Sequence, residues 1–397
     1  MSAPQINLLD GSFYAADPYP TYRWLRENAP LYRDEDRKIW GVSRYRDIVA
    51  IEKNAHLYSS AQGSRPRIPG DTSMINRDDP RHNTQRRLIS PRFTPRAVSK
   101  HEHLIRSHVT ELIDAMLERG SADVVTDLAA PLPAMMINQL LGFPHEMWPK
   151  SLWWSEATML AGGQHGPDGT MNFGATEGGP EAVAEFAQEV MALAALRRSD
   201  PQDDLISVWC HAKVDGEPMT DADILSEALL VLDGGAETTR SVIATTALDL
   251  IRHDDQRRLL AQDPSRMKVA VEEFIRWVTP ILNMRRTVVR DHELHGENLR
   301  EGDELLLMYA SANRDEEVFS DADRYDVTRT PNHHIAFGFG THFCLGASLA
   351  RLELRICFEE LLTRIPEMQL SGDEPVFVPS VFTRAPAAVN IEFEAAR

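Results

Sequence analysis

The chain has 397 residues, 43% of them hydrophobic, which is enough to bury a large core. Sixty acidic residues outnumber 42 basic ones and give a formal net charge of −18, which excludes a general role in binding nucleic acid because phosphates need a basic footprint. No linker rich in Pro, Gly or Ser and no charge block divides the chain, so a single domain over residues 1–397 is expected.

The cysteines and the amino terminus predict where the protein resides. The three cysteines are too few and too scattered for a disulfide framework, which indicates a reducing compartment. The first residues lack a charged segment followed by an apolar one, and no stretch approaches the roughly 18 apolar residues of a membrane span. We therefore expect a cytoplasmic monomer that is not inserted in a membrane.

The first part of the chain predicts short elements around a loop. Residues 17–29 are typical of a helix that begins at a proline, and residues 31–42 of a short hairpin. Residues 59–74 contain Pro, Gly and Ser and predict a loop, in which Arg65 and Arg67 either contact an anionic substrate group or are simply solvated. A helix then begins after Pro80 and places His82 and Arg86, four residues apart, on one face.

A local excess of positive charge follows in this otherwise acidic chain. Residues 81–96 contain no acid and five arginines: Arg81, Arg86, Arg87, Arg92 and Arg96. Such a reversal of sign suggests a docking surface for an acidic partner, to which Arg351 and Arg355 could contribute. The alternative is a set of intramolecular ion pairs with the surplus acidic residues.

The middle of the chain is predicted to be helical. Residues 101–160 alternate helical stretches with breaks at Gly120, Pro131 and Pro144. Seven of the 22 glycines then fall between Gly162 and Gly179, which predicts a long loop between two helices. This loop is interpreted either as a lid over a binding site or as a surface insertion.

A long helix is predicted from Thr220 to about Leu250. Thr220 and Asp223 have the spacing of a capping box. Gly234 and Gly235 interrupt the helical pattern, and two such glycines cost about 1 kcal/mol each relative to alanine. We expect the helix to open locally there and to leave room for a ligand. Asp233 lies four residues before Glu237, so we expect one carboxyl to have a raised pKa or to pair with Arg240.

Cys344 lies in a glycine-containing loop that leads directly into another helix. From Leu345 the apolar residues recur with helical spacing, so Cys344 precedes a helix N-terminus, where backbone N–H groups stabilise the thiolate that binds metals. One alternative is a buried, inert cysteine. Another is a zinc site formed with His334 and His342, which lacks a fourth nearby ligand.

The segment Phe337-Gly-Phe-Gly-Thr-His-Phe-Cys-Leu-Gly346 resembles the haem-binding signature of the bacterial cytochrome P450 family, and Gly-Gly-Ala-Glu237-Thr238 resembles its oxygen-activation motif. The resemblance implies a mainly α fold with a smaller β portion and a long central helix across a haem b group. It also implies a monooxygenase that uses O2, takes electrons from a ferredoxin or flavodoxin, and oxidises a hydrophobic small molecule, with a steroid or another lipid suggested by similar actinobacterial members. The alternative is a non-catalytic haem-binding or sensing protein with the same fold.

The resemblance also implies residue roles. Cys344 is the axial ligand, Glu237 relays protons and Thr238 orients water at the bound oxygen. The cofactor-binding residues are then His82, Arg86, Gly235, Arg286, Phe337, Gly338, His342, Cys344 and Gly346. Glu273 and Arg276 form a buried ion pair beneath the cysteine loop, with Arg324 as the third partner and Arg329 as the second choice. The substrate pocket is lined by Met74, Leu232, Asp233, Ile281, Leu282 and Phe382.

Overall fold

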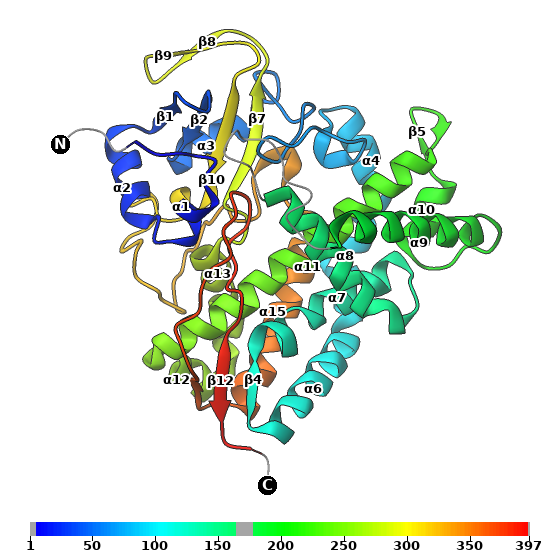
Figure 1. Ribbon diagram of the computed structural model, residues 1–397, viewed down its shortest axis with the longest axis vertical. Helices are drawn as coiled ribbons and strands as arrows, with labels where there is room; N and C mark the ends of the chain where they lie inside the picture. Colours follow the sequence, from blue (N-terminus) through cyan, green and yellow to red (C-terminus); the bar gives the residue numbers. More distant parts are fainter. Residues whose placement is uncertain (1–4, 164–177, 396–397) are drawn as a thin grey trace.

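The computed structural model describes residues 5–163 and 178–395, and helices make up most of it (Figure 1). The helices are α1 Gly11–Ala15, α2 Tyr19–Asn28, α3 Tyr45–Glu52, α4 Arg81–Ile89, α5 Pro95–Val98, α6 Glu102–Arg119, α7 Pro131–Leu141, α8 Trp148–Gly163, α9 Gly179–Ser199, α10 Leu205–His211, α11 Asp221–Arg252, α12 Asp254–Gln262, α13 Met267–Val278, α14 Tyr309–Ala312 and α15 Ala347–Arg364. The strands are β1 Leu31–Asp34, β2 Ile39–Val42, β3 Tyr58–Ser59, β4 Ser121–Asp123, β5 Lys213–Val214, β6 Glu217–Pro218, β7 Asn283–Val288, β8 His292–Leu294, β9 Glu297–Leu299, β10 Glu304–Met308, β11 Met368–Leu370 and β12 Asn390–Phe393.

The long helix α11 crosses the helical part of the molecule (Figure 1) and packs against α7, α8, α13 and α15. It begins at the predicted capping box, in which Asp223 N donates to Thr220 Oγ1 and Thr220 N donates to Asp223 Oδ2, each over 3.1 Å. Its 32 residues form one continuous α-helix. The predicted local opening at Gly234 and Gly235 is therefore wrong, and these glycines serve the packing described below.

The larger sheet lies beside the helices and has the strand order β1-β2-β10-β7-β3 (Figure 1). β1 and β2 form the predicted hairpin, in which Tyr32 pairs with Gly41. β10 runs parallel to β2 and antiparallel to β7, so Leu305 pairs with Trp40 on one side and with Arg286 on the other. This register buries Arg286 at the side of the sheet that faces the helices.

Most of the predicted elements are confirmed. Helix α2 begins after Pro18, and no helix or strand interrupts residues 60–73. Helix α6 ends at Arg119, as the predicted break at Gly120 requires, and Gly120 caps it in a left-handed conformation with a φ of 68°. The glycine-rich stretch between α8 and α9 lies mostly outside the described residues. Within the described part of the chain, no helix is both long and apolar enough to cross a bilayer.

Candidate active site

A cavity opens beside Cys344, between α11 on one side and the cysteine loop with α15 on the other. Its walls are mostly apolar, and they include Val231, Val242, Leu349 and Leu354. The structure brings many of the predicted residues to this one cavity: Met74, His82, Arg86, Gly235, Thr238, Ile281, Arg286, Phe337, Gly338, His342, Cys344 and Gly346. These residues come from five separate segments of the chain, so the site exists only in the folded protein.

The cysteine loop is held by its own backbone and by two glycines. The Cys344 N–H donates to the Phe337 carbonyl over 2.8 Å and closes the loop. Gly338 and Gly340 have φ values of 70° and 68°, in the left-handed region that favours glycine. A Cβ atom at Gly340 would also lie 2.7 Å from the carbonyl oxygen of Glu52. The loop therefore requires glycine at this position.

The sulfur of Cys344 is placed to bind a cation. Burial raises the pKa of the Cys344 thiol, while the backbone N–H groups of Gly346 and Ala347 and the charge of Arg86 lower it. The expected N–H groups are therefore present, but they are outweighed by burial. The helix N-terminus alone therefore does not keep Cys344 ionised. A metal ion deprotonates a coordinating thiol outright, so a metal ion in the cavity would stabilise the Cys344 thiolate.

A rim of basic side chains surrounds one edge of the cavity. The Arg86 Nη2 donates to the Phe343 carbonyl over 2.6 Å, and Arg286 Nη2 lies 3.2 Å from Glu52 Oε1. The rings of His82 and His342 are 4.2 Å apart. Burial and the charge of Arg286 lower the pKa of His342 to about 2. The positive charge of this edge therefore comes from Arg86 and Arg286, to which anionic groups such as propionates would bind.

The opposite wall is formed by the double glycine of α11. A Cβ atom at Gly235 would lie 2.2 Å from Ile137 Cδ1, whereas a Cβ atom at Gly234 would meet no atom of the described residues within 4 Å. Gly235 therefore permits close packing of α7, and Gly234 leaves open space toward the cavity. The Thr238 hydroxyl donates to the Gly234 carbonyl over 2.8 Å and lines the cavity beside it.

Glu237 lies behind this wall rather than in the cavity lining. Arg240 Nη1 is 3.2 Å from Glu237 Oε1 and 2.7 Å from Glu156 Oε1, so one guanidinium bridges two carboxylates. Burial raises the pKa of Glu237, and the charge of Arg240 opposes this rise. Both predicted alternatives hold for Glu237, because its carboxylate pairs with Arg240 and its pKa is raised.

The support beneath the cysteine loop differs in one residue from the prediction. Arg276 donates from Nε and Nη2 to the two oxygens of Glu273, over 2.7 and 2.8 Å, and both side chains are fully buried. The third partner is Arg329, whose Nε lies 3.2 Å from Glu273 Oε2. The prediction of Arg324 is wrong, because that residue is exposed and offers Arg276 only its backbone carbonyl. Sequence spacing alone did not separate the two arginines.

The zinc alternative is not supported by the geometry. His334 Nε2 lies 3.1 Å from Glu272 Oε2, and Glu272 also accepts from Arg351. In residues 5–163 and 178–395, no three His, Cys, Asp or Glu side chains are grouped so that they could hold a metal ion. A haem iron would need only the Cys344 thiolate from the protein, because the haem itself supplies four ligands, so a cluster of protein ligands would not be required.

Three of the six predicted pocket residues are placed differently. The side chains of Leu232 and Leu282 lie in the hydrophobic core and line neither this cavity nor a second cavity that adjoins it, so these two predictions are wrong. Leu230, also on α11, faces both cavities instead. Phe382 is buried beneath Arg65, whose guanidinium carbon is 5.0 Å from the ring centroid.

Two acidic residues of the site were missed from the sequence. Glu52 is buried where it accepts from Arg286 and, over 2.6 Å, from the Tyr309 hydroxyl. Glu353 lines the cavity from α15, and burial raises its pKa to about 8. Glu353 could have been found from the sequence, because it is an acidic residue close to the apolar residues Leu349 and Leu354 of the predicted helix. Glu52 had no such signal, because its partners lie more than 230 residues away in the chain.

Known proteins resemble this chain over most of its length. The family model described as Cytochrome P450 matches residues 181–375. A steroid C26-monooxygenase of Mycobacterium tuberculosis is 40% identical over 97% of this chain and 98% of its own. Linalool 8-monooxygenase of Pseudomonas putida is 34% identical over 89% of this chain and 90% of its own. The structure of a Mycobacterium marinum cytochrome P450 in complex with pseudoionone superimposes with a TM-score of 0.88 at 32% identity and covers 99% of this chain and 100% of its own.

The chain belongs to the cytochrome P450 family, whose members are haem-thiolate monooxygenases that use O2. The residues present fit the haem group. A thiol with two backbone N–H groups directed at it, the guanidinium groups of Arg86 and Arg286 at one edge, and the open space beside Gly234 are features that the cofactor would use.

Proposed function

We propose that this enzyme hydroxylates a hydrophobic small molecule of the steroid or lipid type, with Cys344 as the axial haem ligand. The observation that carries the assignment is the Cys344 sulfur, which faces the cavity opposite Gly234 and Thr238 of α11. When bound, the haem supplies the chemistry that activates dioxygen and inserts one oxygen atom into the substrate. The steroid and monoterpene names of the similar enzymes support the substrate class.

The residues around the cavity have separate tasks in this proposal. His82, Arg86, Arg286 and His342 would bind the propionates of the cofactor, and Gly235, Phe337, Gly338 and Gly346 would line the space that it occupies. Thr238 holds a water molecule through the hydroxyl that otherwise donates to Gly234. Glu237, paired with Arg240, carries protons from solvent toward that hydroxyl. Met74 and Ile281 contact the substrate from the cavity wall.

The electron donor is proposed to be a ferredoxin or flavodoxin that docks on the cysteine side. Four of the arginines predicted for this surface form ion pairs instead: Arg81 with Asp215, Arg92 with Asp203, Arg351 with Glu272 and Arg355 with Glu359. Arg87 and Arg96 are exposed, and the described residues offer neither an ion-pair partner. These two arginines are the ones we assign to the docking surface.

The carbon monoxide spectrum of the reduced protein tests the assignment of the ligand. We expect a Soret band shifted to the position typical of thiolate ligation, loss of that band in Cys344→Ser, and its retention in the control Cys210→Ser. A normal band in Cys344→Ser would overturn the assignment. Substrate turnover driven by a reduced ferredoxin then distinguishes an enzyme from a haem sensor, which would bind carbon monoxide but form no product.

A further inference from the structure

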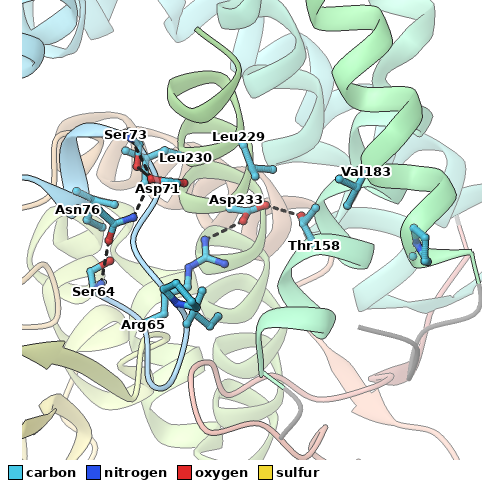
Figure 2. Close-up of a pocket in the computed structure, with 15 residues that line it drawn as sticks. Ser64, Arg65, Asp71, Ser73, Asn76, Thr158, Val183, Leu229, Leu230 and Asp233 are labelled. Carbon is cyan, nitrogen blue, oxygen red and sulfur yellow. Dashed lines mark hydrogen bonds and ion pairs between the residues drawn. The ribbon is translucent and has the colours of Figure 1, made fainter. Parts of the chain in front are cut away.

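A second cavity adjoins the first, and Ile75 and Leu230 line both of them. Its walls come from the loop between β3 and α4, from α8, from the start of α9 and from α11 (Figure 2). Most of the surface is apolar and is supplied by residues such as Ile68, Pro69 and Val183. A molecule that fills both cavities would therefore have a largely hydrophobic body.

Three polar side chains are linked in this second cavity. Arg65 Nη2 lies 2.7 Å from Asp233 Oδ2, and the Thr158 hydroxyl donates to Asp233 Oδ1 over 2.6 Å (Figure 2). The Asp233 residue is 1% exposed, whereas the Arg65 side chain is 21% exposed. Both carboxylate oxygens are thus occupied, and Asp233 acts as a fixed anchor for the guanidinium.

The guanidinium of Arg65 keeps unused donors. Arginine has five N–H groups, and one nitrogen of Arg65 is bound to Asp233. The described residues provide no other acceptor for this side chain, which stacks over the ring of Phe382. Its remaining donors are available to a molecule in the cavity. Because the anchor and the aromatic ring fix the guanidinium plane, little side-chain entropy is lost when it binds an acceptor.

The charges in the lining select the kind of acceptor. Among the described residues, the cavity is lined by one cation, Arg65, and by two carboxylates, Asp71 and Asp233. Asp233 already neutralises the arginine, and Asp71 adds a further negative charge, so an incoming carboxylate would meet net repulsion. A ketone or hydroxyl oxygen accepts the same hydrogen bond without that penalty.

We propose that Arg65 binds a neutral oxygen, a ketone or a hydroxyl, at the end of the substrate that is remote from the site of oxidation. This inference rests on the proposed function and specifies its substrate class. The apolar body would pass Ile75 and Leu230 and present its far end beside Thr238. Arg65 is in this view a specificity-determining residue, and Asp233 and Thr158 are positioning residues.

The first experiment tests the oxygen. Binding of androstanone and of androstane, which lacks the ketone, is measured on the haem-loaded protein by equilibrium dialysis. Arg65→Met should weaken the binding of androstanone about tenfold, as expected for loss of a hydrogen bond from a charged donor. The same substitution should leave the affinity for androstane unchanged. The matched control is Arg67→Met, because Arg67 pairs with Glu304 outside this cavity and should affect neither ligand. Equal weakening of both ligands by Arg65→Met would overturn the proposal.

The second experiment tests the charge. At pH 8, dodecanol should bind more tightly than dodecanoate, which has the same chain but an ionised end. Asp233→Asn removes one negative charge and should raise the affinity for dodecanoate relative to that for dodecanol by roughly tenfold. If this buried substitution prevents haem loading, Asp71→Asn makes the same change at an exposed position. Tighter binding of dodecanoate by the unaltered protein would refute the inference.

These outcomes can be told apart from failure of the proposed function. Loss of the thiolate-type carbon monoxide band would refute Cys344 as the ligand, whatever binds at Arg65. Dialysis reports only the preference for neutral oxygen. A protein with the expected band and product formation, but with no preference between androstanone and androstane, would refute this inference alone.

Discussion

Arg329 lies with its Nε atom 3.2 Å from Glu273 Oε2, and the Glu273 carboxylate is fully buried. The same carboxylate also accepts from Arg276 and from the side chain of Asn332. Glu273 is therefore held between two cations from distant segments. The chain that leads into the cysteine loop is fastened to α13 at this point.

Removing Arg329 should destabilise the fold, whereas removing Arg324 should not. Arg329→Ala leaves Glu273 with one cation, and loss of a contact to a buried charge costs on the order of 2 kcal/mol. Arg324→Ala retains the backbone carbonyl that Arg276 uses, so its effect should stay within about 0.5 kcal/mol. Urea unfolding followed by circular dichroism measures both free energies of unfolding. Equal effects of the two substitutions would contradict the assignment.

The comparison of Arg324 with Arg329 shows where sequence reasoning stops. Helix boundaries, the capping box at Thr220 and the cysteine loop follow from local patterns that the structure confirms. Which of two nearby arginines turns inward depends on the path of an irregular segment, and no periodicity encodes that path. The same holds for Leu232, because a helix buried on several sides gives no signal of which face meets a cavity.

The two glycines of α11 should respond in opposite ways to alanine. Gly235→Ala places a methyl group 2.2 Å from Ile137 Cδ1, so we expect destabilisation of about 1–3 kcal/mol. Gly234→Ala meets no neighbour and should stabilise the helix by up to about 1 kcal/mol. Thermal unfolding measures both variants. Adding Ile137→Ala to Gly235→Ala should restore part of the loss, and no recovery would show that the contact is not the cause.

Glu227 should make the stability depend on pH. Its carboxylate accepts from Met74 N over 2.8 Å and from Gln85 Nε2 over 2.9 Å, and burial raises its pKa from 4.5 to about 8. The folded state therefore keeps a proton that the unfolded state loses, and the protonated group contributes stability that is lost as the pH rises from about 4.5 to about 8.

Substitution of Glu227 by glutamine should remove this dependence. Relative to the unaltered protein, Glu227→Gln should gain on the order of 1 kcal/mol of stability per pH unit across that window and nothing further above it. Urea unfolding at pH 5, 6.5 and 8 provides the measurement. A constant difference between the two proteins at all three values would show that Glu227 does not titrate in the window.

Thr238 should couple electron use to product formation. Thr238→Ala removes the hydroxyl beside Gly234, so electrons should still be consumed while the yield of oxidised product falls about tenfold or more. Thr238→Ser keeps a hydroxyl and serves as the control, which should retain most of the yield. The measurement is the ratio of product to reduced nicotinamide consumed in a system coupled through ferredoxin. An unchanged ratio in the alanine variant would count against this role.

The exposed arginines should control reduction by an acidic electron carrier. Arg87→Glu combined with Arg96→Glu should slow reduction by ferredoxin about tenfold at low ionic strength, and the difference should shrink as salt screens the charges. Lys38→Glu combined with Arg290→Glu changes the net charge equally at exposed positions elsewhere and should have little effect. Stopped-flow measurement of haem reduction compares the variants, and equal rates would exclude this docking surface.

The contact between Asp79 and Thr341 has a consequence for synthesis of the protein. Their side chains are 3.1 Å apart although 262 residues separate them in the chain, and the cavity closes between these two segments. During translation the amino-terminal half can form helices long before the cysteine loop leaves the ribosome. The nascent chain cannot complete the cofactor cavity until almost nine-tenths of it has been made, so haem insertion is necessarily a late event in its maturation.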